Sequence, residues 1–289
     1  MLTLITWNIQ CARTPEGGAD LDRVVDRVLA SGARFDILLL QEVGCGLPAR
    51  DGSPIGDQFA GLARRLDRLH AASAFALDGR NADGSPRRLG CMTFARGPIE
   101  HVRRHALPWP PDHEVPAMPR ATLDTVVATP DGMLRVLNVH LEYFSARQRM
   151  AQVERLRELQ AEALARARVS GAPAAAPHGP GGTPFAPLPQ PAAAILAGDF
   201  NMLPGSDCHA RLLAPGPDGA PLWRDAWEMA HPGEPHAPTV GLHGAGSAAQ
   251  AFTFDYVCVC PALAARVRSL HVDTAATGSD HQPLLLELA

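Results

Sequence analysis

Short apolar runs recur along the chain, and several of them end on a polar side chain. In AILAGDFN, at residues 194–201, small and apolar residues lead into Gly198, Asp199 and Asn201. Runs of four to nine apolar and β-branched residues are typical of buried strands. We predict strands at Leu2–Trp7, Asp36–Leu40, Leu89–Ala95, Ala121–Ala128, Leu134–His140, Ala194–Gly198, Phe252–Cys260, Val267–Val272 and Pro283–Leu288.

Other segments repeat their apolar residues at helical spacing. This spacing predicts an amphipathic helix at Ala19–Ser31, a second helix marked by Phe59, Leu62, Leu66 and Leu69, and a long charged helix at Ala146–Arg168. Early strands alternate with helices, whereas later strands come in pairs. This order predicts an α/β protein with mixed sheets covered by helices.

One segment interrupts this pattern. Residues Ser170–Pro191 consist mainly of Pro, Gly and Ala and carry almost no charge, which is typical of a flexible surface insertion. Pro108–Pro119 and Pro232–Gly246 have the composition of loops. We therefore predict one domain over residues 1–289, with a flexible insertion at about 170–191.

The composition limits the function classes without choosing one. Hydrophobic residues make up 46% and charged residues 19% of the 289, which is ordinary for a globular protein. The net charge of −4 provides no general attraction for nucleic acid, and this argues mildly against tight non-specific duplex binding. A nuclease is still possible, because a bound divalent cation supplies positive charge where the phosphate sits.

The cysteines and the N-terminus indicate a reduced compartment. None of the six cysteines has the C-x2-C spacing of a zinc site. The sequence begins MLTLITWN, without a basic region before an apolar one, and no apolar run is long enough for a membrane span. We expect a cytoplasmic monomer.

The polar residues at the strand ends have side chains that suit one kind of chemistry. A single Gly-Asp-x-Asn could be a turn, but independent turns would not place an amide, a carboxylate or an imidazole after most of the central strands. The oxygen donors suit Mg²⁺ or Mn²⁺ better than zinc. They are Asn8, Glu42, Asp199, Asn201 and Asp280. The imidazoles of His140 and His281 can donate to phosphate or move protons, and Asp255 could orient one of them.

Six motifs together resemble the endonuclease/exonuclease/phosphatase superfamily. They are TWNIQ at 6–10, LQEV at 40–43, NVHLE at 138–142, AGDFNMLP at 197–204, TFDYV at 253–257 and GSDHQPL at 278–284. They occur in the family's order and cover the chain from Thr6 to Leu286. The resemblance implies a four-layered α/β/β/α sandwich of two mixed sheets, as in DNase I, and metal-assisted hydrolysis of a phosphate ester.

The resemblance also implies roles for the strand-end residues. By position, Asn8 and Glu42 match the metal-site residues of the family, and Glu42 matches the direct ligand. Asp280 matches a further metal or water ligand. Asp199 matches the residue that orients or deprotonates the attacking water, and Asn201 matches a donor to the phosphate.

Four further residues match positions around the phosphate. His140 matches a phosphate-contacting residue, and His281 matches the histidine that stabilises the pentacovalent phosphate or acts as acid–base. Asp255 matches the partner of that histidine, and Arg120 matches a basic residue before the middle strand, although a surface charge is an equal alternative. Glu142 and Trp109 receive no role, and we expect the ten other histidines on the surface or in loops.

The sequence leaves the substrate open. We favour a phosphodiesterase or nuclease that acts on DNA or a DNA end, since HLE followed by an Arg- and Gln-rich helix resembles the tyrosyl-DNA phosphodiesterase branch. The acidic balance fits a hydrolase of a small or lipid phosphoester instead. A non-catalytic binding module is the third alternative, and the intact set of residues argues against it. In one departure from the family, Cys91 replaces an Asn that many members carry.

Overall fold

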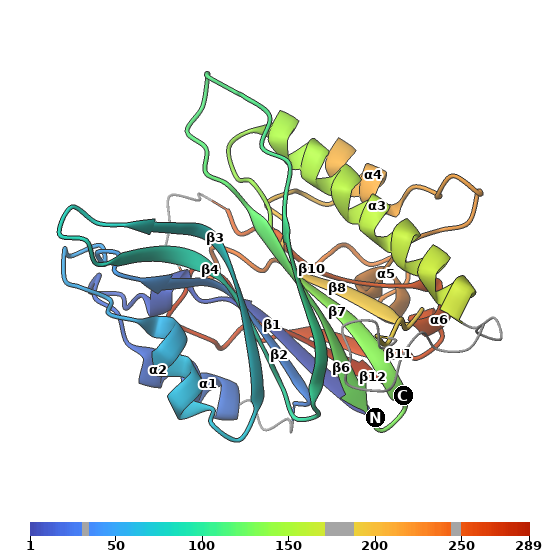
Figure 1. Ribbon diagram of the computed structural model, residues 1–289, viewed down its shortest axis with the longest axis horizontal. Helices are drawn as coiled ribbons and strands as arrows, with labels where there is room; N and C mark the ends of the chain where they lie inside the picture. Colours follow the sequence, from blue (N-terminus) through green and yellow to red (C-terminus); the bar gives the residue numbers. More distant parts are fainter. Residues whose placement is uncertain (31–34, 171–187, 244–249) are drawn as a thin grey trace, which may run out of the picture.

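Two six-stranded sheets pack face to face, and helices cover their outer sides (Figure 1). This computed structural model describes residues 1–30, 35–170, 188–243 and 250–289. The arrangement confirms the predicted α/β sandwich. The predicted insertion at about 170–191 lies mostly outside the described residues.

Each sheet has an order that brings distant segments together. The first sheet has the order β11-β12-β1-β2-β4-β3, and the second has the order β5-β6-β7-β8-β10-β9. The strands of the first are β1 (Leu2–Asn8), β2 (Ile37–Cys45), β3 (His70–Arg80), β4 (Pro86–Ala95), β11 (Val267–Val272) and β12 (Leu284–Leu288). Those of the second are β5 (Ile99–Ala106), β6 (Ala121–Thr129), β7 (Gly132–His140), β8 (Ala194–Asp199), β9 (Arg224–Asp225) and β10 (Asp255–Val259).

The helices divide between the two outer sides. Figure 1 shows α1 (Leu21–Ala30) and α2 (Gln58–Arg65) against the first sheet, and α3 (Ala146–Ser170) with α4 (Asp207–Leu213) against the second. The short elements are η1 (Gln10–Ala12), α5 (Ala226–Ala230) and α6 (Pro261–Ala264). None of the described helices is long and apolar enough to cross a membrane.

The central strands are buried on both faces, which explains their continuous apolar runs. All seven residues of β1 and all six of β8 are buried. One apolar core includes Leu4 and Leu39, which lie between the sheets, and Leu137, which faces α3 on the other side of the second sheet. A second core, with Ile5 and Leu38, lies under α1 and α2.

Strand pairing gathers the polar strand ends at one edge of the sandwich. β1 runs parallel to β2 with Asn8 opposite Gln41, and β7 runs parallel to β8 with His140 opposite Asp199. β10 begins at this edge, antiparallel to β8, with Asp255 opposite Asp199. Parallel strands bring their carboxyl ends to the same edge, and ligands of α/β proteins bind there.

The sequence pattern missed several elements. β3 and β5 were not predicted, because their sequences HAASAFALDGR and IEHVRRHA are too polar or too rich in alanine to read as buried strands. The strand predicted at Phe252–Cys260 begins only at Asp255, and Phe252 forms just an isolated bridge with Val240. The short helices α4, α5 and α6 were also missed.

The expectation that the remaining histidines lie on the surface or in loops is wrong for His209. This side chain is buried, and its Nε2 lies 3.1 Å from Asp225, which also contacts His236 at 2.8 Å. Gly205 N–H donates to His209 Nδ1, so Nε2 carries the proton and donates to Asp225. The cluster has the distances to bind a cation, but these hydrogen bonds already satisfy it as a structural triad.

Candidate active site

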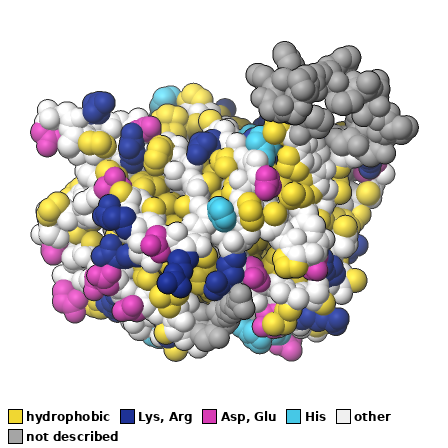
Figure 2. Space-filling model, turned by 60° about the horizontal axis from the view of Figure 1, so that its bottom comes forward, with side chains coloured by type: hydrophobic (Ala, Val, Ile, Leu, Met, Phe, Trp, Pro, Cys, Tyr) yellow, Lys and Arg dark blue, Asp and Glu magenta, His cyan; other side chains and the backbone are white. Residues whose placement is uncertain are grey.

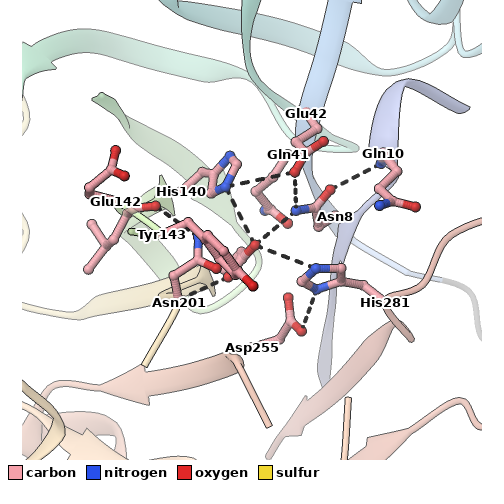
Figure 3. A network of polar contacts seen from close by, with 12 residues as sticks. Asn8, Gln10, Gln41, Glu42, His140, Glu142, Tyr143, Asn201, Asp255 and His281 are labelled. Carbon is pink, nitrogen blue, oxygen red and sulfur yellow. Dashed lines mark hydrogen bonds and ion pairs between the residues drawn. The ribbon is translucent and has the colours of Figure 1, made fainter. Parts of the chain in front are cut away.

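The predicted polar residues surround one cavity at the carboxyl-end edge of the sheets. Its volume is about 510 Å³. Seven of the nine predicted residues line it: Glu42, Arg120, His140, Asp199, Asn201, Asp280 and His281. The other two, Asn8 and Asp255, lie behind this lining and hydrogen-bond to it (Figure 3).

Asp199 is the centre of the network. It is 1% exposed, and its Oδ2 accepts a hydrogen bond of 2.9 Å from Asn8 Nδ2. The same oxygen lies 3.5 Å from His140 Nε2 and 3.7 Å from His281 Nε2. Burial raises the pKa of Asp199 to about 7, although the charge of His281 acts in the opposite direction. The group therefore changes its protonation near neutral pH.

Local backbone geometry aims the acidic side chains into the cavity. Glu42 has φ 52° and lies where the register between β2 and β4 shifts, as in a β-bulge. Asn201 has φ 50°, an uncommon conformation for a residue other than glycine. At Gly198, with φ 142°, a Cβ atom would lie 2.0 Å from Val139 O, so only glycine allows β7 and β8 to approach this closely.

Asn8 joins the carboxylates across the two sheets. Its Nδ2 donates to Glu42 Oε1 at 3.0 Å as well as to Asp199, while its Oδ1 accepts from Gln10 N at 3.0 Å. The amide oxygen is thus already engaged, and the amide nitrogen positions two acids (Figure 3). Gln10, which the sequence reasoning did not select, also accepts from Asp280 N at 3.2 Å.

His281 has a fixed orientation and a high proton affinity. Its Nδ1 lies 2.8 Å from Asp255 Oδ2, and Thr239 Oγ1 donates to the same carboxylate at 2.6 Å. Burial lowers the pKa of His281, but the charges of Asp255 and Asp199 outweigh this effect and raise the pKa to about 10. The imidazolium form therefore persists at neutral pH, with Nε2 facing the cavity side of Asp199.

Arg120 is a buried cation of the site and not a surface charge. It is 7% exposed, its Nε lies 3.2 Å from Glu142 Oε2, and its Nη1 lies 3.0 Å from His140 Nε2. A guanidinium only donates, so His140 Nε2 accepts. Burial, with the charges of Arg120 and His281, holds the pKa of His140 well below its usual range. His140 is thus neutral.

Glu142 is a site residue to which the sequence assigned no role. It is completely buried, it pairs with Arg120, and it accepts a hydrogen bond of 2.9 Å from Phe144 N. Its place two residues after His140 was a possible signal, but the partner lies 22 positions away. Only the pairing of the strands brings the two together.

The donor set fits a divalent cation. Glu42, His140 and Asp199 have atoms within 4.8 Å of one another that could hold a cation, but His140 Nε2 already accepts from Arg120, so the carboxylates are the available donors. On the same cavity wall, Asp280 Oδ1 is buried and has no hydrogen-bond partner among the described residues. Burial raises the pKa of Asp280 and the charge of His281 lowers it. Asp280 Oδ1 lies 3.8 Å from His281 Nε2, beyond hydrogen-bond distance. A buried oxygen that accepts no hydrogen bond is costly, and an oxygen-binding cation would satisfy it.

Comparison with known proteins assigns the chain to a class. The profile of the Endonuclease/Exonuclease/phosphatase family matches residues 5–281, and the chain therefore belongs to this family. Its members are hydrolases that act on phosphoesters, and the resemblance of the six motifs is confirmed. No curated protein sequence matches the chain significantly.

Solved structures share the fold at low identity. A mannosyl-6-phosphatase from Bacteroides thetaiotaomicron VPI-5482 has a TM-score of 0.68 and 18% identity, with both chains fully covered. A 3′ phosphatase from Neisseria, bound to a product DNA hairpin, has a TM-score of 0.62 and 19% identity, again with full coverage. A family protein from Beutenbergia cavernae DSM 12333 has a TM-score of 0.63 and 21% identity, over 100% of this chain and 72% of that chain.

Proposed function

We propose that this protein is a divalent-metal-dependent phosphodiesterase whose reacting phosphate lies in the cavity around Asp199. The proposal rests mainly on the surroundings of Asp199. Its buried carboxylate has a pKa of about 7 and contacts the amide of Asn8 and the imidazoles of His140 and His281. A general base is most effective when its pKa lies near the working pH. Asp199 would accept the proton of the attacking water.

Two cations would stabilise the charge on the phosphate oxygens. His281 is protonated and held by Asp255, so its Nε2–H can donate into the cavity. Arg120 is held through Nε and Nη1, and its Nη2 has no hydrogen bond to any described residue. Donors that are fixed before the reaction need no rearrangement as charge develops. In this arrangement His140 positions Arg120.

Glu42 and Asp280 would hold the divalent cation of the site. A bound Mg²⁺ or Mn²⁺ would neutralise a phosphate oxygen or the leaving oxygen, as divalent cations do in phosphoryl chemistry. Asn8 would keep Glu42 in place through its Nδ2 hydrogen bond. We propose the cation as Mg²⁺ or Mn²⁺ because its ligands are mainly oxygen atoms.

The relatives support more than one substrate. The Neisseria structure contains DNA, which agrees with our prediction of a DNA-active or DNA-end-processing enzyme, and the Bacteroides protein is a mannosyl-6-phosphatase. The net charge of −4 favours a small phosphoester, because duplex binding needs several cations in contact with phosphates. On the face of the molecule in Figure 2, arginines are interspersed with acidic side chains.

A hydrolysis panel tests the proposal. Bis-p-nitrophenyl phosphate, plasmid DNA, an abasic-site duplex, a 5′-tyrosyl oligonucleotide and inositol phosphates are each incubated with Mg²⁺, Mn²⁺ or EDTA. The Asp199→Asn protein and the surface control Asp78→Asn are tested in parallel. The Asp78 side chain is 53% exposed, and among the described residues it pairs with Arg88 alone. We expect metal-dependent turnover that is lost in the first variant and kept in the second. Activity that survives Asp199→Asn would refute the assignment.

The salt dependence of that activity separates the substrate classes. The binding constant of a protein for duplex DNA falls as the salt concentration rises, and each phosphate contact adds about one to the slope of log K against log salt. A duplex substrate should therefore lose activity steeply between about 50 and 200 mM salt. A flat dependence with a small phosphoester would favour the second alternative.

A further inference from the structure

The cavity has an aromatic wall that the proposed chemistry does not use. Tyr143 and Phe144 form an edge-to-face pair with ring centres 4.7 Å apart, and Tyr143 meets Phe254 at 6.1 Å. Phe254 in turn packs against Phe252 at 4.5 Å. All four line the cavity, and the residues Tyr143 and Phe144 are 50% and 54% exposed. We call these four residues the aromatic wall.

The exposed pair is held in place by its own backbone. Phe144 N donates to Glu142 Oε1, and Arg149 Nη1 donates to the carbonyl oxygens of Glu142 and Tyr143 at 2.7 and 2.8 Å. In Figure 3 the Tyr143 side chain extends from this segment across the polar cluster toward His281. Glu142 is also the partner of Arg120, so one carboxylate positions both the rings and the cation.

The cationic side chains of the cavity are placed to contact a single phosphate. Among the described residues that line it, Arg120 and His281 are the cationic side chains, and both face the same region near Asp199. The other lining residues are the acidic and neutral polar groups of the site and apolar side chains such as Leu89, Met118 and Val240. A polynucleotide backbone needs a cation near each successive phosphate, and the cavity offers no second such place.

We propose that Tyr143 and Phe144 select phosphoesters that carry an aromatic ring, a nucleobase or an aryl group, close to the reacting phosphate. The proposal rests on the proposed function, because it uses the same phosphate position. Exposed rings at a cavity mouth present faces on which a planar ring can stack, and stacking is insensitive to the identity of the base. A cavity of about 510 Å³ is in the range of pockets for small ligands.

Direct binding of phosphonates tests the proposal, because a C–P bond cannot be hydrolysed as an ester. Calorimetry in Mn²⁺ buffer compares phenylphosphonate with methylphosphonate, and the 5′-methylenephosphonate of thymidine with that of 1,2-dideoxyribose, which lacks only the base. Each pair differs by one ring. We expect the ring-bearing member to bind roughly tenfold more tightly to the wild-type protein.

The variants assign the preference to the rings. Tyr143→Ala and Phe144→Ala should each remove most of it, whereas Tyr143→Phe should keep it, because the ring and not the hydroxyl makes the contact. Met133→Ala is the control: Met133 is 41% exposed on β7 and does not line the cavity. A preference in the thymidine pair alone indicates a nucleobase, and one in the phenyl pair alone indicates an aryl ester.

Three results would overturn the proposal: equal binding within both pairs, no binding of any phosphonate, or an equal loss for both members of a pair in Tyr143→Ala. The hydrolysis panel reports separately on the proposed function. Ring-dependent binding without hydrolysis would refute the proposed phosphodiesterase function and support the role of the aromatic wall. Hydrolysis without ring-dependent binding would support the function and refute the role of the aromatic wall.

Discussion

Asp124 offers the sharpest test of how this fold supports the site. It is buried on β6, and Arg135 of the neighbouring strand β7 donates to both of its oxygens at 3.0 and 2.9 Å. His105 and Arg103, on β5, lie 3.1 and 3.3 Å from its Oδ2. These contacts join the strands that lead to Arg120 and His140. We predict that Asp124→Asn lowers the stability of the protein in a pH-dependent way.

The magnitude follows from the pKa. Burial alone would raise the pKa of Asp124, but hydrogen bonds from His105 and Arg135 and the charges of the arginines lower it from 3.8 to about 2. A pKa that is lower in the folded state stabilises the fold above the unfolded value, and this contribution is lost as the pH falls from about 4 to 2. At 1.36 kcal/mol per pKa unit the contribution is about 2 kcal/mol. Removing one partner of a buried pair costs about 3–5 kcal/mol at neutral pH.

Urea unfolding at pH 7, 4 and 2.5 measures the effect. We expect Asp124→Asn to be the less stable protein by about 3–5 kcal/mol at pH 7, with the difference shrinking by about 2 kcal/mol at pH 2.5. Asp78→Asn, which removes an exposed ion pair, should cost less than about 1 kcal/mol at every pH. A difference that stays constant from pH 7 to 2.5 would refute the reasoning.

Three other predictions concern the site. Asp199→Asn should abolish turnover while the melting temperature stays equal or rises, because the amide resembles the neutral acid that burial favours; a large drop in melting temperature would contradict this. Because burial raises the pKa of Asp280, protons should compete with the cation for this proposed ligand; the affinity for Mn²⁺ should fall as the pH is lowered, and calorimetry should find a weaker dependence in Asp280→Asn. Glu142→Gln should lower stability by about 3 kcal/mol and reduce kcat, since Arg120 loses its buried partner; unchanged urea unfolding would refute it.

The apolar pattern was sufficient for the central strands and the polar residues that follow them. β1, β2, β7 and β8 are buried on both faces, so their sequences are continuous apolar runs that stop where the cavity begins. The edge strands β3 and β5 lack this signal. The motifs at the strand ends then identified the family, because their order along the chain is specific even though each is short.

The sequence by itself therefore determined the fold class, the family and nine residues that the structure places in or behind one cavity. Only the tertiary structure decided which groups meet: Arg120 with Glu142, His209 with Asp225, and Tyr143 with Phe254. The physical reason is that the spacing of apolar residues shows which side of a helix or strand faces the core. These contacts depend instead on strand order and register between segments far apart in the chain. The protonation of Asp199 and His281 depends on the same contacts, since burial and neighbouring charges exist only in the folded protein.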